Sequence, residues 1–264
     1  MGIATGIDGS PASLEAAALV EELGFSTLWL NGGPLPGLRT IADVVRATRT
    51  IRVAAGILSV DKYDALSVAS LYDELEAEQP GRFVVGLGGA HGAKPVATIS
   101  SYLDQLDSVP AGARVLAALG PRMLRLARDR SAGAYPVLIT PEYAAQARSL
   151  LGDGPLLAVQ QMVVLETDPA RAREIARGTL GFLGRAPGYA GNFRRMGFTD
   201  DEIDRVDDRL VGGLVAWGDP AAIATRVTAL REAGADHVAL GVLSETRGTQ
   251  PLDEWRALAG TLVR

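Results

Sequence analysis

The chain has 264 residues, a formal net charge of −5 and a hydrophobic content of 47%. It contains no cysteine and two histidines, which excludes disulfides, thiol catalysis and thiolate metal sites and argues against a histidine-rich zinc site. A mildly acidic protein offers no electrostatic reason for binding nucleic acid or an anionic membrane, and neither partner is expected. No stretch reaches about 18 uncharged apolar residues, and the first residues have no basic and apolar leader pattern, so we expect a cytoplasmic protein without a transmembrane helix.

Short apolar runs alternate with amphipathic helical patterns along most of the chain. In the first half, the sequence predicts strands at 3–7, 27–30, 53–58 and 83–87, and helices at 12–23, 40–48, 65–77 and 95–106. In the second half, it predicts strands at 114–119, 136–139, 157–165 and 237–242, and helices at 121–130, 141–151, 171–183, 221–233 and 251–262. The repeating unit is therefore one strand followed by one helix.

The eight predicted strands are apolar on both faces, as parallel strands covered on both sides should be. Their number and the chain length favour an α/β fold of the (β/α)₈ TIM-barrel type, with residues 1–264 forming a single domain. The alternative is an open, doubly wound sheet.

One segment departs from this alternation. Between residues 167 and 219 we find no strand-like run, and we predict a helical insertion at about 168–218 between the seventh and eighth strands. The pattern from Thr199 to Glu202 predicts a capping box at the start of one of its helices. The acidic residues between 200 and 208 could suggest a cation site, but with Arg205 and Arg209 at helical spacing we interpret them as a solvated face.

In a (β/α)₈ barrel the active site lies at the carboxyl ends of the strands, so the residues at the end of each predicted strand and directly after it are the candidates. They are rich in glycine and poor in charged groups. They are Asp8-Gly9, Asn31-Gly32-Gly33, Ala55 to Ser59, Gly86 to Gly92, Leu119-Gly120-Pro121-Arg122 and Thr140-Pro141-Glu142. Glycines allow a flat ligand to approach the backbone, and the helices that begin at Pro121 and Pro141 offer free N–H groups to a phosphate. This pattern favours a cofactor that supplies the chemistry, and the alternative is that the glycines only form tight turns.

The two histidines differ in their predicted positions. His91 follows a strand among glycines, and it is the only ionisable ring at the predicted mouth of the barrel, where it could transfer a proton. The alternative is a structural histidine. His237 begins the last predicted strand at the opposite rim, and we predict a structural role for it.

Several short segments, in their order and spacing, resemble the luciferase-like monooxygenase superfamily, and most of all its coenzyme F420-dependent (deazaflavin) oxidoreductases. The matching segments are Leu23-Gly24-Phe25 with Leu28-Trp29-Leu30, Gly56-Ile57-Leu58, Pro80-Gly81-Arg82-Phe83 with Gly86-Leu87-Gly88, Leu116 to Pro121, Trp217-Gly218-Asp219-Pro220, and Ala233 to Val238. The resemblance covers nearly the whole chain.

The resemblance implies an oxidoreductase that transfers a hydride between coenzyme F420 and a small organic substrate. It implies a non-prolyl cis peptide, here Gly56–Ile57, that supports the middle ring of the cofactor. His91 occupies the position of a proton-transferring residue. The implied cofactor-binding residues are Asn31, Gly56, Ile57, Leu58, Gly88, Gly89, Ala90, Leu119, Gly120, Pro121, Arg122, Thr140 and Pro141. The last six would hold the ribityl and phosphate portion.

The chain also departs from the family pattern. Related deazaflavin enzymes carry a histidine after the second strand, where this chain has Asn31-Gly32-Gly33. Two alternatives therefore stay open beside the F420 hypothesis: an FMN-dependent monooxygenase that uses molecular oxygen, and a non-catalytic barrel that binds a flavin or deazaflavin. The resemblance further implies a homodimer that pairs through helices near the start of the chain.

Overall fold

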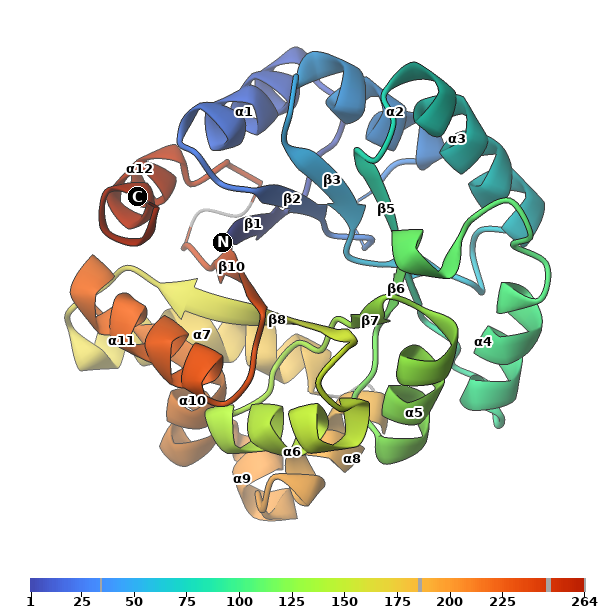
Figure 1. The fold of residues 1–264 in the computed structure, drawn as a ribbon. Helices are drawn as coiled ribbons and strands as arrows, with labels where there is room; N and C mark the ends of the chain where they lie inside the picture. Colours follow the sequence, from blue (N-terminus) through green and yellow to red (C-terminus); the bar gives the residue numbers. More distant parts are fainter. Residues whose placement is uncertain (34, 185–186, 246–247, 264) are drawn as a thin grey trace.

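The computed structural model describes residues 1–33, 35–184, 187–245 and 248–263. Figure 1 looks into a ring of strands surrounded by helices. The ring consists of β1 (Gly2–Thr5), β2 (Thr27–Leu30), β3 (Arg52–Ala55), β5 (Phe83–Gly88), β6 (Arg114–Leu116), β7 (Gly133–Ala134), β8 (Leu156–Val164) and β10 (His237–Val242). All pairings are parallel, and β10 closes the ring because it pairs with both β1 and β8. The predicted (β/α)₈ barrel is confirmed, and the open sheet is excluded.

Helices cover the outside of the ring. They are α1 (Pro11–Glu22), α2 (Leu38–Ala47), α3 (Ala65–Glu78), α4 (Pro95–Leu103), α5 (Pro121–Arg130), α6 (Pro141–Leu151), α11 (Pro220–Glu232) and α12 (Leu252–Leu262), and a 3₁₀ turn, Ala111–Ala113, precedes β6. Side chains that accept a hydrogen bond from the first turn define several helix starts, among them Ser10, Thr140 and Asp219, each followed by proline.

The third predicted strand, 53–58, is interrupted. β3 ends at Ala55, and the short β4 (Leu58–Ser59) resumes the pairing with β5 after a cis peptide bond between Gly56 and Ile57. Ala54 pairs with Val84, whereas Leu58 pairs with Leu87, so four residue steps on this strand face three on its neighbour. The one extra residue makes the interruption a β-bulge, at the position that the resemblance implies.

The sixth predicted strand, 136–139, is displaced. The structure has β7 at Gly133–Ala134, and only an isolated bridge between Val137 and Gln160 follows it. Pro136 has no N–H group to donate to a neighbouring strand, which limits regular pairing at this point. Gly133 has a φ of 153°, and a Cβ placed on it would lie 1.9 Å from the carbonyl oxygen of Leu156, so only glycine fits there.

The predicted insertion contains α7 (Pro169–Leu183), α8 (Pro187–Arg195), α9 (Asp200–Arg205), α10 (Asp208–Leu214) and the short strand β9 (Val215–Trp217). The expectation of no strand between 167 and 219 is therefore wrong. β9 pairs with the last residues of β8. Residues 162 and 163 pair with β10 on one edge of β8, so β9 takes the other edge, beyond the point where β7 has ended. Three residues are too few to stand out as an apolar run in the sequence.

The predicted capping box is confirmed. Thr199 and Glu202 form a capping box, since each side chain accepts a hydrogen bond from the other's backbone N–H group. The acidic residues form ion pairs with arginines of the same segment, including Arg205 with Asp201 and Arg209 with Glu202. Within the described ranges, no group of three or more metal-ligating side chains is found, and no helix is long and apolar enough to cross a membrane.

Candidate functional site

A cavity of about 990 Å³ lies at the carboxyl ends of the barrel strands. The ends of the strands form one wall, and α7 with Tyr189 of α8 forms the other. The strand-end wall consists of Ala4, Thr5, Gly6, Asn31, Gly32, Gly33, Gly56, Ile57, Ala117, Tyr135, Val137, Gln160, Met162, Gly241 to Glu245, Gly248, Thr249 and Pro251. The helical wall consists of Glu174, Ile175, Gly178, Thr179, Phe182, Leu183 and Tyr189. The insertion thus encloses the mouth of the barrel.

Tyr135 lines this cavity and stacks on Trp29, which is buried in the barrel behind it. The Trp29 and Tyr135 rings lie 3.9 Å apart with an angle of 3° between their planes. The Tyr135 hydroxyl donates a hydrogen bond to Gln160 Oε1 at 3.1 Å, and Trp29 Nε1 donates to His237 Nε2 at 3.2 Å. The stacking and the hydrogen bond to Gln160 restrain the Tyr135 ring, which lies next to Gly56: a Cβ placed on Gly56 would lie 3.1 Å from it.

Tyrosines and glutamates are the titratable groups that line the described cavity: Tyr135, Tyr189, Glu174 and Glu245. Burial raises the pKa of Tyr135 well above its usual value and raises the pKa of Tyr189 as well. Both phenols therefore stay protonated near neutral pH and act as hydrogen-bond donors rather than as bases. No lysine, arginine or histidine is among the lining residues in the described ranges.

Two of the glycines at the strand ends are needed by the bulge itself. A Cβ placed on Gly32 would lie 1.7 Å from the carbonyl oxygen of Ile57, and a Cβ placed on Gly86 would lie 1.8 Å from that of Ala55. By contrast, a Cβ placed on Gly33 has no neighbour within 4 Å. The glycine-rich ends therefore serve two purposes, since some make room for the bulge and others leave the cavity open.

The cavity brings together three of the predicted cofactor-binding residues, Asn31, Gly56 and Ile57. The others lie at the same end of the barrel but outside the lining. Leu58 is fully buried beneath the bulge, and Cβ atoms placed on Gly88 and Gly89 would collide with Ala117 and Ser59 respectively. Ala90 is half-buried.

The predicted phosphate residues lie at the starts of α5 and α6. Gly120 is the N-cap of α5 and supplies no side-chain hydrogen bond, whereas Pro121 and Arg122 are exposed in the first turn. Thr140 caps α6 by accepting a hydrogen bond from the Tyr143 N–H group, and the Tyr143 hydroxyl donates to the Leu119 carbonyl oxygen. This last contact ties the two helix starts together.

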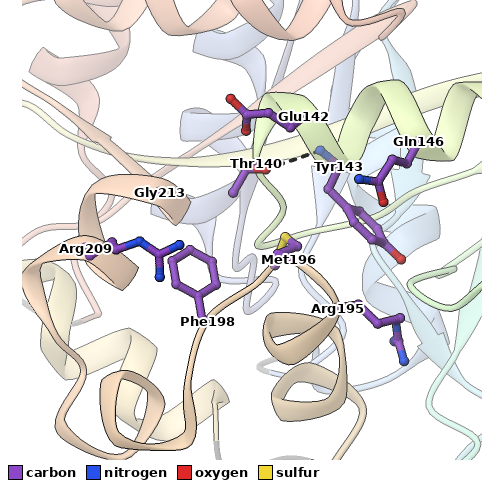
Figure 2. A pocket seen from close by; sticks show the side chains of 9 residues that line it. All are labelled: Thr140, Glu142, Tyr143, Gln146, Arg195, Met196, Phe198, Arg209 and Gly213. Carbon is purple, nitrogen blue, oxygen red and sulfur yellow. Dashed lines mark hydrogen bonds between the residues drawn. The ribbon is translucent and has the colours of Figure 1, made fainter.

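A second cavity, of about 330 Å³, lies between the start of α6 and the insertion (Figure 2). Its lining residues are Thr140, Glu142, Tyr143, Gln146, Arg195, Met196, Phe198, Arg209 and Gly213. Figure 2 shows Arg195 on the side of Tyr143, and Arg209 beside Phe198 on the other side. A Cβ placed on Gly120 would lie 3.6 Å from Arg195 Nη2, so this arginine reaches the start of α5.

Arg195 was missed at the level of the sequence. It belongs to α8 and follows no strand, and nothing in the sequence distinguishes it from the adjacent Arg194. In the structure the two differ: Arg194 forms an ion pair with Asp200, whereas Arg195 Nε donates to Asn192 Oδ1 at 3.2 Å. Only the fold brings Arg195 to the N-terminus of α5.

The two histidines lie in opposite environments. The His91 side chain is 72% exposed, and its Nδ1 lies 2.8 Å from Asp61 Oδ2. Hydrogen bonds from His91 lower the pKa of Asp61. An ionised carboxylate can only accept, so the contact favours the tautomer with the proton on Nδ1, which leaves Nε2 as the acceptor nitrogen. His91 does not line the cavity. His237 is buried at the opposite rim, where burial lowers its pKa to about 3, in agreement with the predicted structural role.

No family model matches the chain. A Bacillus subtilis protein described as uncharacterised, YwcH, is 32% identical over 90 residues, which span 31% of this chain and 27% of that protein. Its activity is therefore no guide to the whole chain.

Solved structures match over almost the full length. The coenzyme F420-dependent tetrahydromethanopterin reductase of Methanopyrus kandleri is 16% identical with a TM-score of 0.79, covering 99% of this chain and 97% of that chain. An F420-dependent secondary alcohol dehydrogenase is 14% identical with a TM-score of 0.75 and the same coverage. The oxygenating constituent of 3,6-diketocamphane monooxygenase of Pseudomonas putida, in complex with FMN, is 12% identical with a TM-score of 0.67, covering 98% and 96%. At these identities the likeness concerns architecture: this chain has the same (β/α)₈ barrel fold as these proteins.

Proposed function

We propose that this protein is an oxidoreductase that binds coenzyme F420 in the cavity of about 990 Å³ and transfers a hydride between it and a small organic substrate. The observation that carries the proposal is the cavity itself: it lies at the carboxyl ends of the strands and is lined by glycines and apolar groups with few titratable side chains. FMN, used with molecular oxygen, is the alternative coenzyme. The fold neighbours support both, since two are named for F420 and one contains FMN.

The size and lining of the cavity fit such a group. Ligand cavities commonly measure about 300–1,000 Å³, so this cavity lies at the upper end and has room for a tricyclic ring and a second small molecule. Asn31, Gly56 and Ile57 would face the ring, and the Tyr135 phenol, fixed by Trp29 and Gln160, supports them from below.

The negatively charged phosphate of the coenzyme has to be bound outside the main cavity. Both coenzymes carry a phosphate, and the described cavity lining contains no cation. We assign the phosphate to the N-terminus of α5, which has no side-chain cap and where Arg195 of the insertion reaches Gly120; Pro121 and Arg122 form the first turn there. Leu119, Thr140 and Pro141 would then lie beside the ribityl chain.

When bound, the coenzyme supplies the hydride or accepts it. The protein has to orient the two reactants and exclude water, for which α7 closes the cavity opposite the strand ends. We propose His91 for proton transfer, as the sequence predicts. Its contact with Asp61 supports this role, since it fixes the ring and leaves Nε2 able to accept a proton. Tyr189, which lines the cavity, is the competing proton donor.

A coenzyme titration tests this proposal. Fluorescence of F420 and of FMN would be followed as each is mixed with the purified protein, and saturable binding of at least one at micromolar concentration is expected. Absence of binding by both at high micromolar concentration would defeat the assignment. The coenzyme with the lower Kd separates the F420 hypothesis from the FMN hypothesis.

Two neighbouring arginines provide a matched test of the phosphate assignment. Arg195→Met should weaken FMN binding about tenfold, because a charge-assisted contact to phosphate is lost, whereas Arg194→Met should change it less than about twofold. Riboflavin, which lacks the phosphate, should bind both variants equally. An equal effect of Arg195→Met on riboflavin and FMN would contradict the assignment.

A non-catalytic barrel is the second candidate. It is favoured by one observation: the described cavity lining includes no histidine, and the strand-two position that carries one in related enzymes holds Asn31. A protein that binds F420 or FMN tightly but turns over neither alcohols, ketones nor oxygen would support this candidate over the enzyme.

A further inference from the structure

Helix α7 has two apolar faces, although a helix on the surface of a barrel needs only one. Ala172, Ala176 and Leu180 are buried in the second hydrophobic cluster, together with Phe193 and Leu210 of the insertion. Spaced at i, i+3, i+4 and i+7, a second set lines the large cavity: Ile175, Gly178, Thr179 and Phe182. The packing of the insertion buries the first face. Ile175 contacts both this cluster and the cavity, whereas Gly178, Thr179 and Phe182 face the cavity.

Phe182 is the clearest member of this cavity-lining face. Its side chain is 79% exposed, and Leu66, which is 76% exposed, is the other large apolar residue left this open in the described part of the chain. The two differ in their surroundings, because Phe182 belongs to the cavity wall and Leu66 does not. An exposed phenyl ring at the mouth of a cavity is positioned to be covered by whatever enters it.

The charges at the mouth restrict what can enter. Glu174 and Glu245 are the charged side chains of the described lining, and Glu245 is held by Arg171 at 3.1 Å. Arg171 offsets the charge of Glu245, so the Glu174 carboxylate, with no cation among the described lining residues, is the charge that disfavours an anionic ligand on this side of the cavity.

Two of the polar side chains opposite α7 already have partners within the protein. Thr5 Oγ1 donates to Gln250 Oε1 at 2.9 Å, and Gln160 Oε1 accepts from Tyr135. A ligand between these two groups and α7 therefore gains little from carrying polar groups at these positions.

We propose that the α7 wall, formed by Ile175, Thr179 and Phe182, binds a neutral, predominantly apolar organic substrate. The inference deepens the proposed function, since it names the substrate class of the same cavity, and the binding step can be tested without turnover. The substrate occupies the space between α7 and the strand ends, with Phe182 packed against it at the mouth.

A pair of fluorescent probes with one skeleton tests the charge requirement. N-phenyl-1-naphthylamine is neutral, and 1-anilinonaphthalene-8-sulfonate is the same molecule with an added sulfonate. We expect the neutral probe to bind one to a chain with a Kd about tenfold lower than that of the sulfonate. Equal or tighter binding of the sulfonate would overturn the proposal.

Two exposed apolar residues provide the matched variants. Phe182→Ser should weaken binding of the neutral probe about fivefold, because contact with one face of a phenyl ring is lost, and Leu66→Ser should leave it unchanged. Equal effects of the two substitutions would contradict a specific α7 site.

Sedimentation of both variants completes the test. A change in oligomeric state with Phe182→Ser, at unchanged probe affinity, would make Phe182 a contact between copies and overturn the proposal.

A repeat of the titration with saturating FMN or F420 separates this inference from the proposed function. Binding of the neutral probe beside the coenzyme supports both. Full displacement of the probe by the coenzyme assigns the α7 wall to the coenzyme and overturns the substrate inference alone. Probe binding without any coenzyme binding leaves the α7 site standing and defeats the proposed oxidoreductase.

Discussion

The two ends of the barrel use their polar groups in opposite ways. At the N-terminal end, Arg82 and Arg148 donate to backbone carbonyl groups that precede the strands, and His237 accepts from Trp29. At the C-terminal end, the strands finish in glycines around a cavity of about 990 Å³. Side chains at the first end satisfy the backbone and stabilise the fold, whereas the second end is left open for a ligand. Substitutions at the N-terminal end should therefore act on the free energy of unfolding, and those at the C-terminal end on binding and turnover.

Arg82 should give the largest effect on stability. Its buried guanidinium donates to the Ile51 carbonyl oxygen at 2.6 Å, to Thr48 Oγ1 at 2.7 Å and to Gln79 Oε1. Arg82→Met leaves these buried acceptors without a donor and should lower the free energy of unfolding by about 4 kcal/mol. Denaturant unfolding measures the change. The exposed Arg39→Met is the control, expected within about 0.5 kcal/mol of the wild type; equal losses in both variants would contradict the assigned role.

The bulge allows the open end to be tested with two adjacent glycines. Gly32→Ala would force a Cβ against the Ile57 carbonyl oxygen, and we expect a loss of about 3 kcal/mol in the free energy of unfolding together with weaker coenzyme binding. Gly33→Ala meets no atom within 4 Å and should preserve both. If Gly32→Ala unfolds at the same denaturant concentration as Gly33→Ala, the Gly32 backbone does not pack against the Ile57 carbonyl oxygen.

His237 should make stability depend on pH. Its pKa of about 3 in the folded protein lies below the value of about 6.5 in an unfolded chain, so only the unfolded state takes up the proton between these values. Stability is therefore full above pH 6.5 and falls as the pH drops, by about 2 kcal/mol between pH 7 and pH 5. The difference in unfolding free energy between wild type and His237→Gln, measured at both pH values, isolates this contribution. A difference that is the same at pH 7 and pH 5 would show that His237 is not desolvated.

Long, regular elements could be predicted from the sequence. The strands at 27–30 and 237–242 and the helices at 121–130 and 141–151 have the predicted bounds, because buried apolar runs and amphipathic helices that begin with proline carry strong local signals. Short elements could not be predicted from the sequence. β9 has three residues and β7 has two, and both depend on pairing with β8, a contact distant in the sequence.

The candidate site likewise contains residues that could be predicted from the sequence and residues that could not. Asn31, Gly56 and Ile57 follow strands directly, so the barrel rule alone places them at the cavity. Tyr135, Phe182 and Arg195 could not be predicted, since Tyr135 depends on the displaced sixth strand and the other two on how the insertion folds over the mouth. Local sequence patterns predict which residues follow a strand, but they do not predict which helix, distant in the sequence, covers those residues.

His91 should give the smallest effect on stability and the sharpest test of chemistry. Its exposed contact with Asp61 contributes little to the free energy of unfolding, so His91→Ala should unfold within about 0.5 kcal/mol of the wild type. If His91 transfers the proton, turnover should fall about a hundredfold at unchanged coenzyme affinity. Tyr189→Phe is the matched variant, since it removes one hydroxyl from the cavity wall and keeps the ring. Steady-state kinetics with F420 or FMN decide between the two residues: unchanged turnover in His91→Ala, with a large loss in Tyr189→Phe, would transfer the role from the exposed histidine to the half-buried phenol of the cavity wall.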